Sequence, residues 1–235
     1  MEKISEKNNK VVFKTDMNVS LANAIRRSAN EIPILAVDEV DIYKNDSALY
    51  DEIIAHRVGL VPLKNQKVKE GDVVEMKLSV KAEGQRREVL AKDLGKEVVY
   101  DNIPIVILDK QQEIELVAKA KQGKGIEHAK FSPGLLSYRH FNKVEVGKDA
   151  EKSTELAEMY PEVFAVEGGK LKVKNEAALD IDTEELEEFK GVKVTPTEDL
   201  IYTIESWGQI DAEEIFKDAV KALNKNLDEL SKELK

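Results

Sequence analysis

The sequence contains no cysteine. Disulfide bonds, thiolate zinc sites and cysteine-held iron–sulfur clusters are therefore excluded. Long hydrophobic runs are missing too, because no stretch reaches the roughly 18 apolar residues of a membrane-spanning helix. The polar N-terminus MEKISEKNNK has no apolar core of the kind found in signal peptides. We therefore expect a cytoplasmic protein.

Motifs of common catalytic and nucleotide-binding sites are also absent. No G-x-S-x-G, P-loop or G-x-G-x-x-G pattern occurs. The three histidines, His56, His128 and His140, lack the spacing of metal ligands. The loop at Gly123–Gly125 is a weak candidate for a phosphate cradle and is more typical of a docking loop. The residues alone thus favour a binding or assembly module over an independent small-molecule enzyme.

Charge is abundant but unevenly distributed. The net charge of −10 argues against a duplex DNA binder, since neutralisation of phosphates dominates such affinity. Residues 149–190 hold thirteen acidic and five basic residues, whereas residues 121–143 hold one acidic and five basic residues. An acidic module after a basic loop suggests separate surfaces for separate partners, with ordinary solvated charge as the alternative for the acidic segment.

The stretch 20–63 carries the densest local signals. Asn18 or Ser20 can cap a first helix, which Pro33 ends. A strand is predicted over 34–43, where β-branched residues are frequent. A second helix follows a turn at 45–47 and ends near Gly59. Both helices show an amphipathic stripe: Leu21, Ile25, Ser28 and Ile32 in the first, Leu49, Ile53, His56 and Leu60 in the second.

The sequence pattern of residues 64–148 predicts short strands and turns. Val74 to Val80 and Ile114 to Ala120 alternate between apolar and polar residues, which predicts two half-buried strands. Further strands are expected over 10–14, 103–108 and 141–146. The loop 122–137 is too long and polar for a simple hairpin turn, and such loops are usually functional or disordered.

Residues 149–198 form a distinct third piece. Its pattern predicts a helix over 154–159, a hairpin around Gly168–Gly169, a helix over 183–189 and a strand over 192–194. A further strand is predicted over 200–206.

The C-terminal segment is predicted to be one long helix with a heptad seam. Such a face either packs on the chain's own sheet or docks onto a partner protein. Burial of each side chain would contribute roughly 1.5–3 kcal/mol. The seam consists of Phe216, Val220, Leu223, Leu227, Leu230 and Leu234.

Several motifs together resemble one protein family. They are LANAIRR at 21–27, the stretch 31–63, GKGIEHAKFSP at 123–133 and SYR at 137–139. Their order and content resemble the D subunits of archaeal DNA-directed RNA polymerases. That family is related to the N-terminal region of the bacterial alpha subunit and to the eukaryotic third-largest polymerase II subunit.

The resemblance implies an α+β fold with a split dimerisation domain. That domain would comprise 1–45 and 200–235, with an inserted β-rich domain at 46–148. Many family members carry a ferredoxin-like insertion whose cysteines hold iron–sulfur clusters, and residues 149–198 resemble it. Ser153, Leu156 and Tyr160 stand at cysteine positions, so we expect a remnant without a cluster. Its expected core is Leu156, Phe164, Val166, Leu186 and Phe189.

The resemblance also implies a role and partners. Family members pair with the small subunit L, as the counterpart of the alpha dimer. This pair forms the platform for the two large catalytic subunits, with the small subunits N and P. The chain would contact DNA only indirectly, as part of the complex. No catalytic, cofactor-binding or metal-binding residue is expected on this chain. A stand-alone ferredoxin-type electron carrier is the rival reading, which the missing cysteines exclude.

The implied interface residues fall into three groups. The helix pairing would use Leu21, Ile25, Phe216, Val220, Leu223, Leu227 and Leu230. The large subunits would be met by Asn23, Arg26 and Arg27 on the first helix and by Lys124, His128 and Lys130 on the loop.

Overall fold

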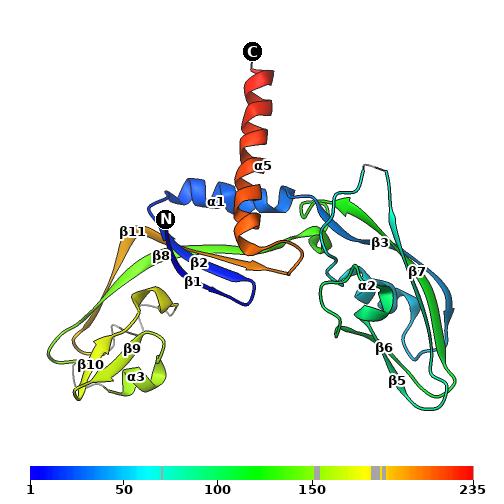
Figure 1. Ribbon diagram of the computed structural model, residues 1–235. Helices are drawn as coiled ribbons and strands as arrows, with labels where there is room; N and C mark the ends of the chain where they lie inside the picture. The colour runs from blue at the N-terminus through cyan, green and yellow to red at the C-terminus, as the bar shows by residue number, and fades with distance from the viewer. Residues whose placement is uncertain (70, 151–153, 181–185, 187–188, 235) are drawn as a thin grey trace. The chain divides into compact units, whose positions relative to one another are not determined.

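The computed structural model describes residues 1–69, 71–150, 154–180, 186 and 189–234. The chain is mixed α/β, mostly sheets with few helices (Figure 1). It divides into two compact units, each formed from two separate stretches of sequence. Unit 1 comprises Met1–Asn23 and Leu136–Thr203, and unit 2 comprises Ala24–Leu135 and Ile204–Lys235. None of the helices in the described residues is long and apolar enough to cross a membrane.

Unit 1 is built on a four-stranded sheet. The strand order is β1 (Glu2–Lys7), β2 (Lys10–Thr15), β11 (Val192–Ser206) and β8 (Gly134–Val146). Asn8 and Asn9, with φ of 49° and 63°, form the tight turn between β1 and β2, a conformation that asparagine tolerates well. The two strands predicted over 192–194 and 200–206 are one continuous strand, because pairing in the sheet carries β11 through the polar residues between them.

Aromatic packing forms the centre of unit 1. The Tyr202 ring is fully buried and stacks on Phe13 and Tyr138, with centroid distances of 5.4 and 6.1 Å. Its hydroxyl donates to the carbonyl oxygen of Ala22 at 3.3 Å. Ala22 lies in helix α1 (Val19–Ser28), so Tyr202 ties the first turns of this helix to the sheet. The predicted cap is confirmed, since Asn18 Oδ1 accepts a hydrogen bond from the Leu21 amide at 2.8 Å.

A small module in unit 1 follows β8. It contains α3 (Glu155–Met159), the hairpin of β9 (Phe164–Glu167) and β10 (Lys170–Val173), and the short helix η4 (Glu176–Ala178). Gly168 and Gly169 make the hairpin turn with positive φ, as expected. Leu156, Phe164 and Leu186 are buried and Phe189 packs beside them, as predicted.

The prediction is wrong for one core residue of this module. Val166 is 45% exposed, whereas Leu171, which pairs with it across the hairpin, is buried and fills this part of the core. Val163, Leu171 and Leu179 fill the core instead. The expectations for Ser153 and for most of the helix over 183–189 lie outside the described residues.

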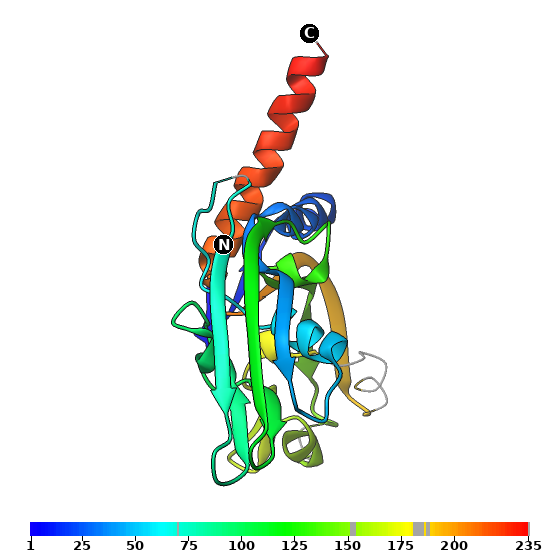
Figure 2. The ribbon, with the colours of Figure 1, turned by 90° about the vertical axis from the view of Figure 1, so that its right-hand side faces the viewer.

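Unit 2 is built on a three-stranded antiparallel sheet with the order β3 (Ile34–Asn45), β7 (Glu113–Gly123) and β4 (Val74–Lys81), which Figure 2 shows side by side. The alternation predicted for β4 is confirmed, since Met76, Leu78 and Val80 are buried between exposed neighbours. A second ribbon pairs β5 (Arg87–Leu90) with β6 (Pro104–Leu108). Helix α2 (Asp51–Gly59) packs on β3 through Ile54 and Val58, which are fully buried.

The amphipathic stripes of the two short helices coincide only in part with the faces that pack in the core. In α1 and the turn after it, Ile25, Ser28 and Ile32 are buried, but Leu21 is 44% exposed. In α2 the stripe residues Ile53 and Leu60 face outward and are 47% and 52% exposed, whereas Leu49 packs against the core of unit 2. The predicted domain boundaries stay a prediction. The boundary predicted at residue 45 would place β3 and β7 in different domains, yet the two strands pair in one sheet.

Candidate partner interface

The long helix α5 (Ala212–Glu233) presents two different faces. Ala212, Ile215 and Ala219 are buried in unit 2. The predicted heptad seam lies beside this packed face and opens progressively along the helix. Phe216, Val220 and Leu223 are half-buried, whereas Leu227, Leu230 and Leu234 are 54%, 52% and 79% exposed. In Figures 1 and 2 the C-terminal part of α5 runs clear of the other elements of unit 2.

A polar contact joins α5 to the residues that follow α1. Asn226 Nδ2 donates to Glu31 Oε1 at 2.8 Å. Glu31 ends the short helix η1 (Ala29–Glu31), which follows α1 and packs against α5. Lys124 Nζ lies 3.9 Å from the other carboxylate oxygen of Glu31. A groove of about 470 Å³ runs between α5 and this region, with both acidic and basic side chains on its rim.

The basic loop is shorter than predicted and is anchored. β7 continues to Gly123, the short helix η3 spans Ala129–Phe131, and β8 begins at Gly134. The Ile126 amide donates to the Asn30 carbonyl oxygen at 3.2 Å. A side chain at Gly125 would clash here, since a Cβ would lie 2.8 Å from Asn30 Oδ1. This close approach leaves little room for a side chain at residue 125, and the hydrogen bond from Ile126 holds the loop against the residues that follow α1.

The predicted loop residues serve different purposes. Lys130 points inward and pairs with Asp38 on β3, with Nζ 2.7 Å from Oδ1, so it anchors the loop. His128 Nδ1 accepts a hydrogen bond from the Lys130 amide at 3.1 Å and caps η3, while its ring is exposed. Lys124 is half-buried beside Glu31. The structure therefore gives Lys130 a structural contact, and the partner role of all three residues stays a prediction.

Asp38 is the electrostatic centre of this anchor. Lys121 Nζ lies 2.7 Å from its second oxygen, so two ammonium groups share one carboxylate. The hydrogen bonds from Lys121 and Lys130 lower the pKa of Asp38 more than burial raises it. The same pairing raises the pKa of Lys121.

This arrangement predicts a specific effect of acid. Because the pKa of Asp38 is lowered in the folded state, its stabilisation is present above the unfolded pKa of about 4. It is lost as the pH falls through the folded pKa. We expect Asp38→Asn to be less stable than the native chain at pH 7, and the difference to shrink below about pH 4. Urea denaturation at a series of pH values measures this, with the exposed Asp72→Asn as control. A difference in unfolding free energy between D38N and the native chain that stays the same from pH 7 to below about pH 4 would contradict this expectation.

The interface residues predicted on α1 also differ in their exposure. Ile25 is buried in the chain's own core, whereas Leu21 is exposed. Asn23 and Arg26 are half-buried and Arg27 is exposed. Of these five residues, Leu21 and Arg27 are thus the ones in the exposed class that a partner could contact.

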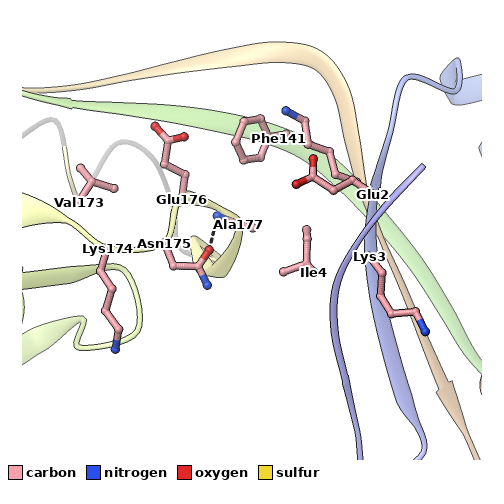
Figure 3. Close-up of a pocket in the computed structure, with 10 residues that line it drawn as sticks. Glu2, Lys3, Ile4, Phe141, Val173, Lys174, Asn175, Glu176 and Ala177 are labelled. Atoms are coloured by element: carbon pink, nitrogen blue, oxygen red, sulfur yellow. Dashed lines mark hydrogen bonds between the residues drawn. The ribbon is translucent and has the colours of Figure 1, made fainter.

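Unit 1 contains a separate groove of about 670 Å³, shown in Figure 3. β1, Phe141 and residues 173–177 line it, and Ile4 points into it. Several polar groups on its lining are engaged within the fold. Lys14 pairs with Asp199 at 3.0 Å, Glu176 accepts from the Val144 amide at 3.0 Å, and Asn175 accepts from the Ala177 amide at 3.1 Å. Within the described ranges no group of three or more His, Asp or Glu residues could hold a metal ion.

Comparison with known proteins identifies the family. The model of the RNA polymerase Rpb3/RpoA insert domain matches residues 30–136. The chain is 34% identical to DNA-directed RNA polymerase subunit Rpo3 of Pyrococcus horikoshii over 239 residues, covering 93% of this chain and 90% of that protein. It is 32% identical to the subunit of the same name from Archaeoglobus fulgidus over 256 residues, covering 99% and 96%. Since these similarities extend over nearly the whole length of both proteins, the chain belongs to the Rpo3 family of DNA-directed RNA polymerase subunits.

Proposed function

We propose that this chain is the non-catalytic assembly-platform subunit of a DNA-directed RNA polymerase. In this role it pairs with the small subunit L, as the counterpart of the alpha dimer, and docks the large catalytic subunits together with the small subunits N and P. The observation that carries the proposal is the exposed leucine seam of α5. Family membership supports it, since the relatives are named as subunits of this enzyme.

The seam has the properties of a helix-pairing surface. Leu227, Leu230 and Leu234 are all more than half exposed and follow the spacing of a heptad. Burial of each would contribute roughly 1.5–3 kcal/mol, so leaving them in water is unfavourable. The hydrogen bond of Asn226 to Glu31 links α5 to η1, and Leu227, the next residue along the helix, begins the exposed part of the seam. A partner helix along this seam would supply the missing burial.

The large subunits would meet a second surface around α1 and the basic loop. Arg27 and His128 are exposed, and Arg26, Asn23 and Lys124 are half-buried. Lys130 contributes by holding the loop to Asp38 at 2.7 Å. We place nucleotidyl transfer on other chains of the polymerase.

Reconstitution with and without this chain tests the proposal. The cognate polymerase subunits are mixed with the chain, or with the chain omitted, and RNA synthesis on a DNA template is measured. We expect RNA synthesis and co-elution of the large subunits only when the chain is present, and none from the chain alone. Full synthesis by the mixture that lacks the chain would contradict the proposal.

The small module of unit 1 is proposed to be stable without a cofactor. Leu156 stands at one of the cysteine positions and is fully buried among Phe164 and Leu171, so an apolar core occupies this place. We expect less than about one iron and one acid-labile sulfide per ten chains, measured by colorimetric analysis of anaerobically purified protein, because thiolate ligands are absent. Stoichiometric acid-labile sulfide would contradict this expectation.

A further inference from the structure

Polar side chains hold the turn that leads into α5. Gln209 is 8% exposed, and its Nε2 donates to the Leu35 carbonyl oxygen at 3.4 Å. Asn65 lies in the chain that follows α2, and its amide donates to the Gln209 carbonyl oxygen at 3.3 Å. The Oδ1 of Asn65 accepts from the Leu35 amide at 3.0 Å. Asn65 and Gln209, which we call the polar clamp, therefore join this turn to the start of β3.

The polar clamp binds an edge of β3. Among the described residues β3 lies at the end of the strand order β3, β7, β4, and an edge strand presents backbone groups that no further strand pairs. At Leu35 both the amide and the carbonyl oxygen are bonded to side chains of the clamp. Asn65 Nδ2 also donates to the Pro33 carbonyl oxygen at 3.1 Å. The clamp thus takes the place of a further strand over residues 33–35.

Stability alone does not explain the side-chain amide of Gln209. Its Oε1 is buried and has no hydrogen-bond partner among the residues that the structure describes. A buried acceptor without a partner is unfavourable, whereas an apolar side chain of similar shape carries no such penalty. The amide contributes one long hydrogen bond, which places residue 209 against Leu35. This combination indicates a role in position and not in stability.

α5 has a second bond to the same short segment. Residues 31–35 carry both the clamp contact at Leu35 and the hydrogen bond from Asn226 to Glu31 at 2.8 Å. The exposed part of the seam begins beyond this second point, at Leu227. Because it continues the same helix, its direction follows the way in which the buried half of α5 is seated on residues 31–35.

We propose that Asn65 and Gln209 are positioning residues that set the direction in which α5 leaves unit 2. Neither residue belongs to the seam, so both act through the turn before the helix. The consequence for binding rests on the proposed function: a seam that already points in one direction loses less freedom when a partner helix binds. Loss of the clamp is therefore expected to widen the range of directions of α5 and to weaken pairing with the small subunit.

Distances between two spin labels measure the direction of α5 in the full chain. Because the chain contains no cysteine, Asp228→Cys on α5 and Lys77→Cys on β4 give two defined label positions. Both positions are exposed and lie in unit 2. Double electron–electron resonance gives the distribution of distances between the labels, which widens when α5 takes up more directions relative to the sheet.

Gln209→Met and Asn65→Leu each remove the side-chain hydrogen bonds of one clamp residue. Gln66→Met is the matched control, since Gln66 is exposed next to Asn65 and its side chain is not part of the clamp. We expect Q209M to keep a thermal midpoint within about 3 °C of the native chain, because it also removes the unpartnered oxygen. Both clamp variants should widen the distance distribution about twofold and weaken binding of the small subunit about fivefold. Q66M should match the native chain in all three measurements.

The outcomes separate this inference from general destabilisation and from the proposed function. A native-like distance distribution in Q209M or in N65L would overturn the inference, and so would equal widening in Q66M. Unfolding of Q209M would also overturn it, since Gln209 would then be needed for the fold itself. If the native chain does not bind the small subunit, the proposed function fails, while the label distances still test the polar clamp.

Discussion

Replacement of Leu223 and Leu227 together by aspartate is expected to abolish pairing with the small subunit. The two carboxylates would be buried without partners in the helix seam, and each such burial costs several kcal/mol. Since 1.4 kcal/mol is a factor of ten in affinity, we expect a loss of at least about 100-fold. The chain itself should remain folded, because Leu227 is 54% exposed and Leu223 is half-buried.

Lys225→Asp is the matched control for this variant. Lys225 lies on α5 outside the leucine seam, and its side chain is 74% exposed. Isothermal titration of the small subunit into each variant measures the affinities, and circular dichroism checks that the helix is retained. An L223D/L227D variant that binds within threefold of the native chain would show that the seam is not the pairing surface.

The second large effect is expected at Tyr202. Tyr202→Ala removes a fully buried ring that stacks between Phe13 and Tyr138. Removal of a buried aromatic ring costs about 3–5 kcal/mol of unfolding free energy. Tyr202→Phe keeps the ring and loses the hydroxyl that donates to Ala22, for which we expect about 1 kcal/mol.

Urea denaturation of both variants, followed by far-ultraviolet circular dichroism, measures this difference. Because Tyr202 also ties α1 to the sheet, Y202A should weaken every interaction that uses the first turns of α1, such as those of Leu21. Equal stabilities of Y202A and Y202F would contradict the central role of the ring in unit 1.

Local periodicity predicted those elements in which one face is clearly covered. Met76, Leu78 and Val80 alternate with charged or polar residues, and β4 follows this pattern as predicted. Strands without such a pattern were missed. β1 reads EKISEK with no regular apolar side, and it exists because β2 pairs with it. Likewise, sheet pairing and not local sequence makes β11 one strand.

Periodicity also cannot say which side of a short helix is covered. In α2 the stripe of Ile53 and Leu60 has the expected spacing, yet Ile54 and Val58 make the core. The covered side depends on where the sheet lies, which is tertiary information. The same limit applies to α1, where Ile25 is buried and Leu21 is exposed.

The contacts that anchor the α5 and loop regions could not be predicted from the sequence. The heptad of α5 and the basic loop are visible in the sequence, since both are local patterns. The pairs Lys130–Asp38 and Asn226–Glu31 join residues 92 and 195 positions apart, so no local pattern indicates them. The family resemblance implies a partner contact for Lys130, whereas the structure shows its ammonium group paired with Asp38.

In the proposed function this chain pairs with one small polymerase subunit through the seam of α5. Its most direct test is the molar mass of the chain co-expressed with the cognate small subunit, measured by light scattering after size-exclusion chromatography. We expect a single species with the summed mass of one copy of each chain. Separate elution of the two proteins, each at its own mass, would contradict it.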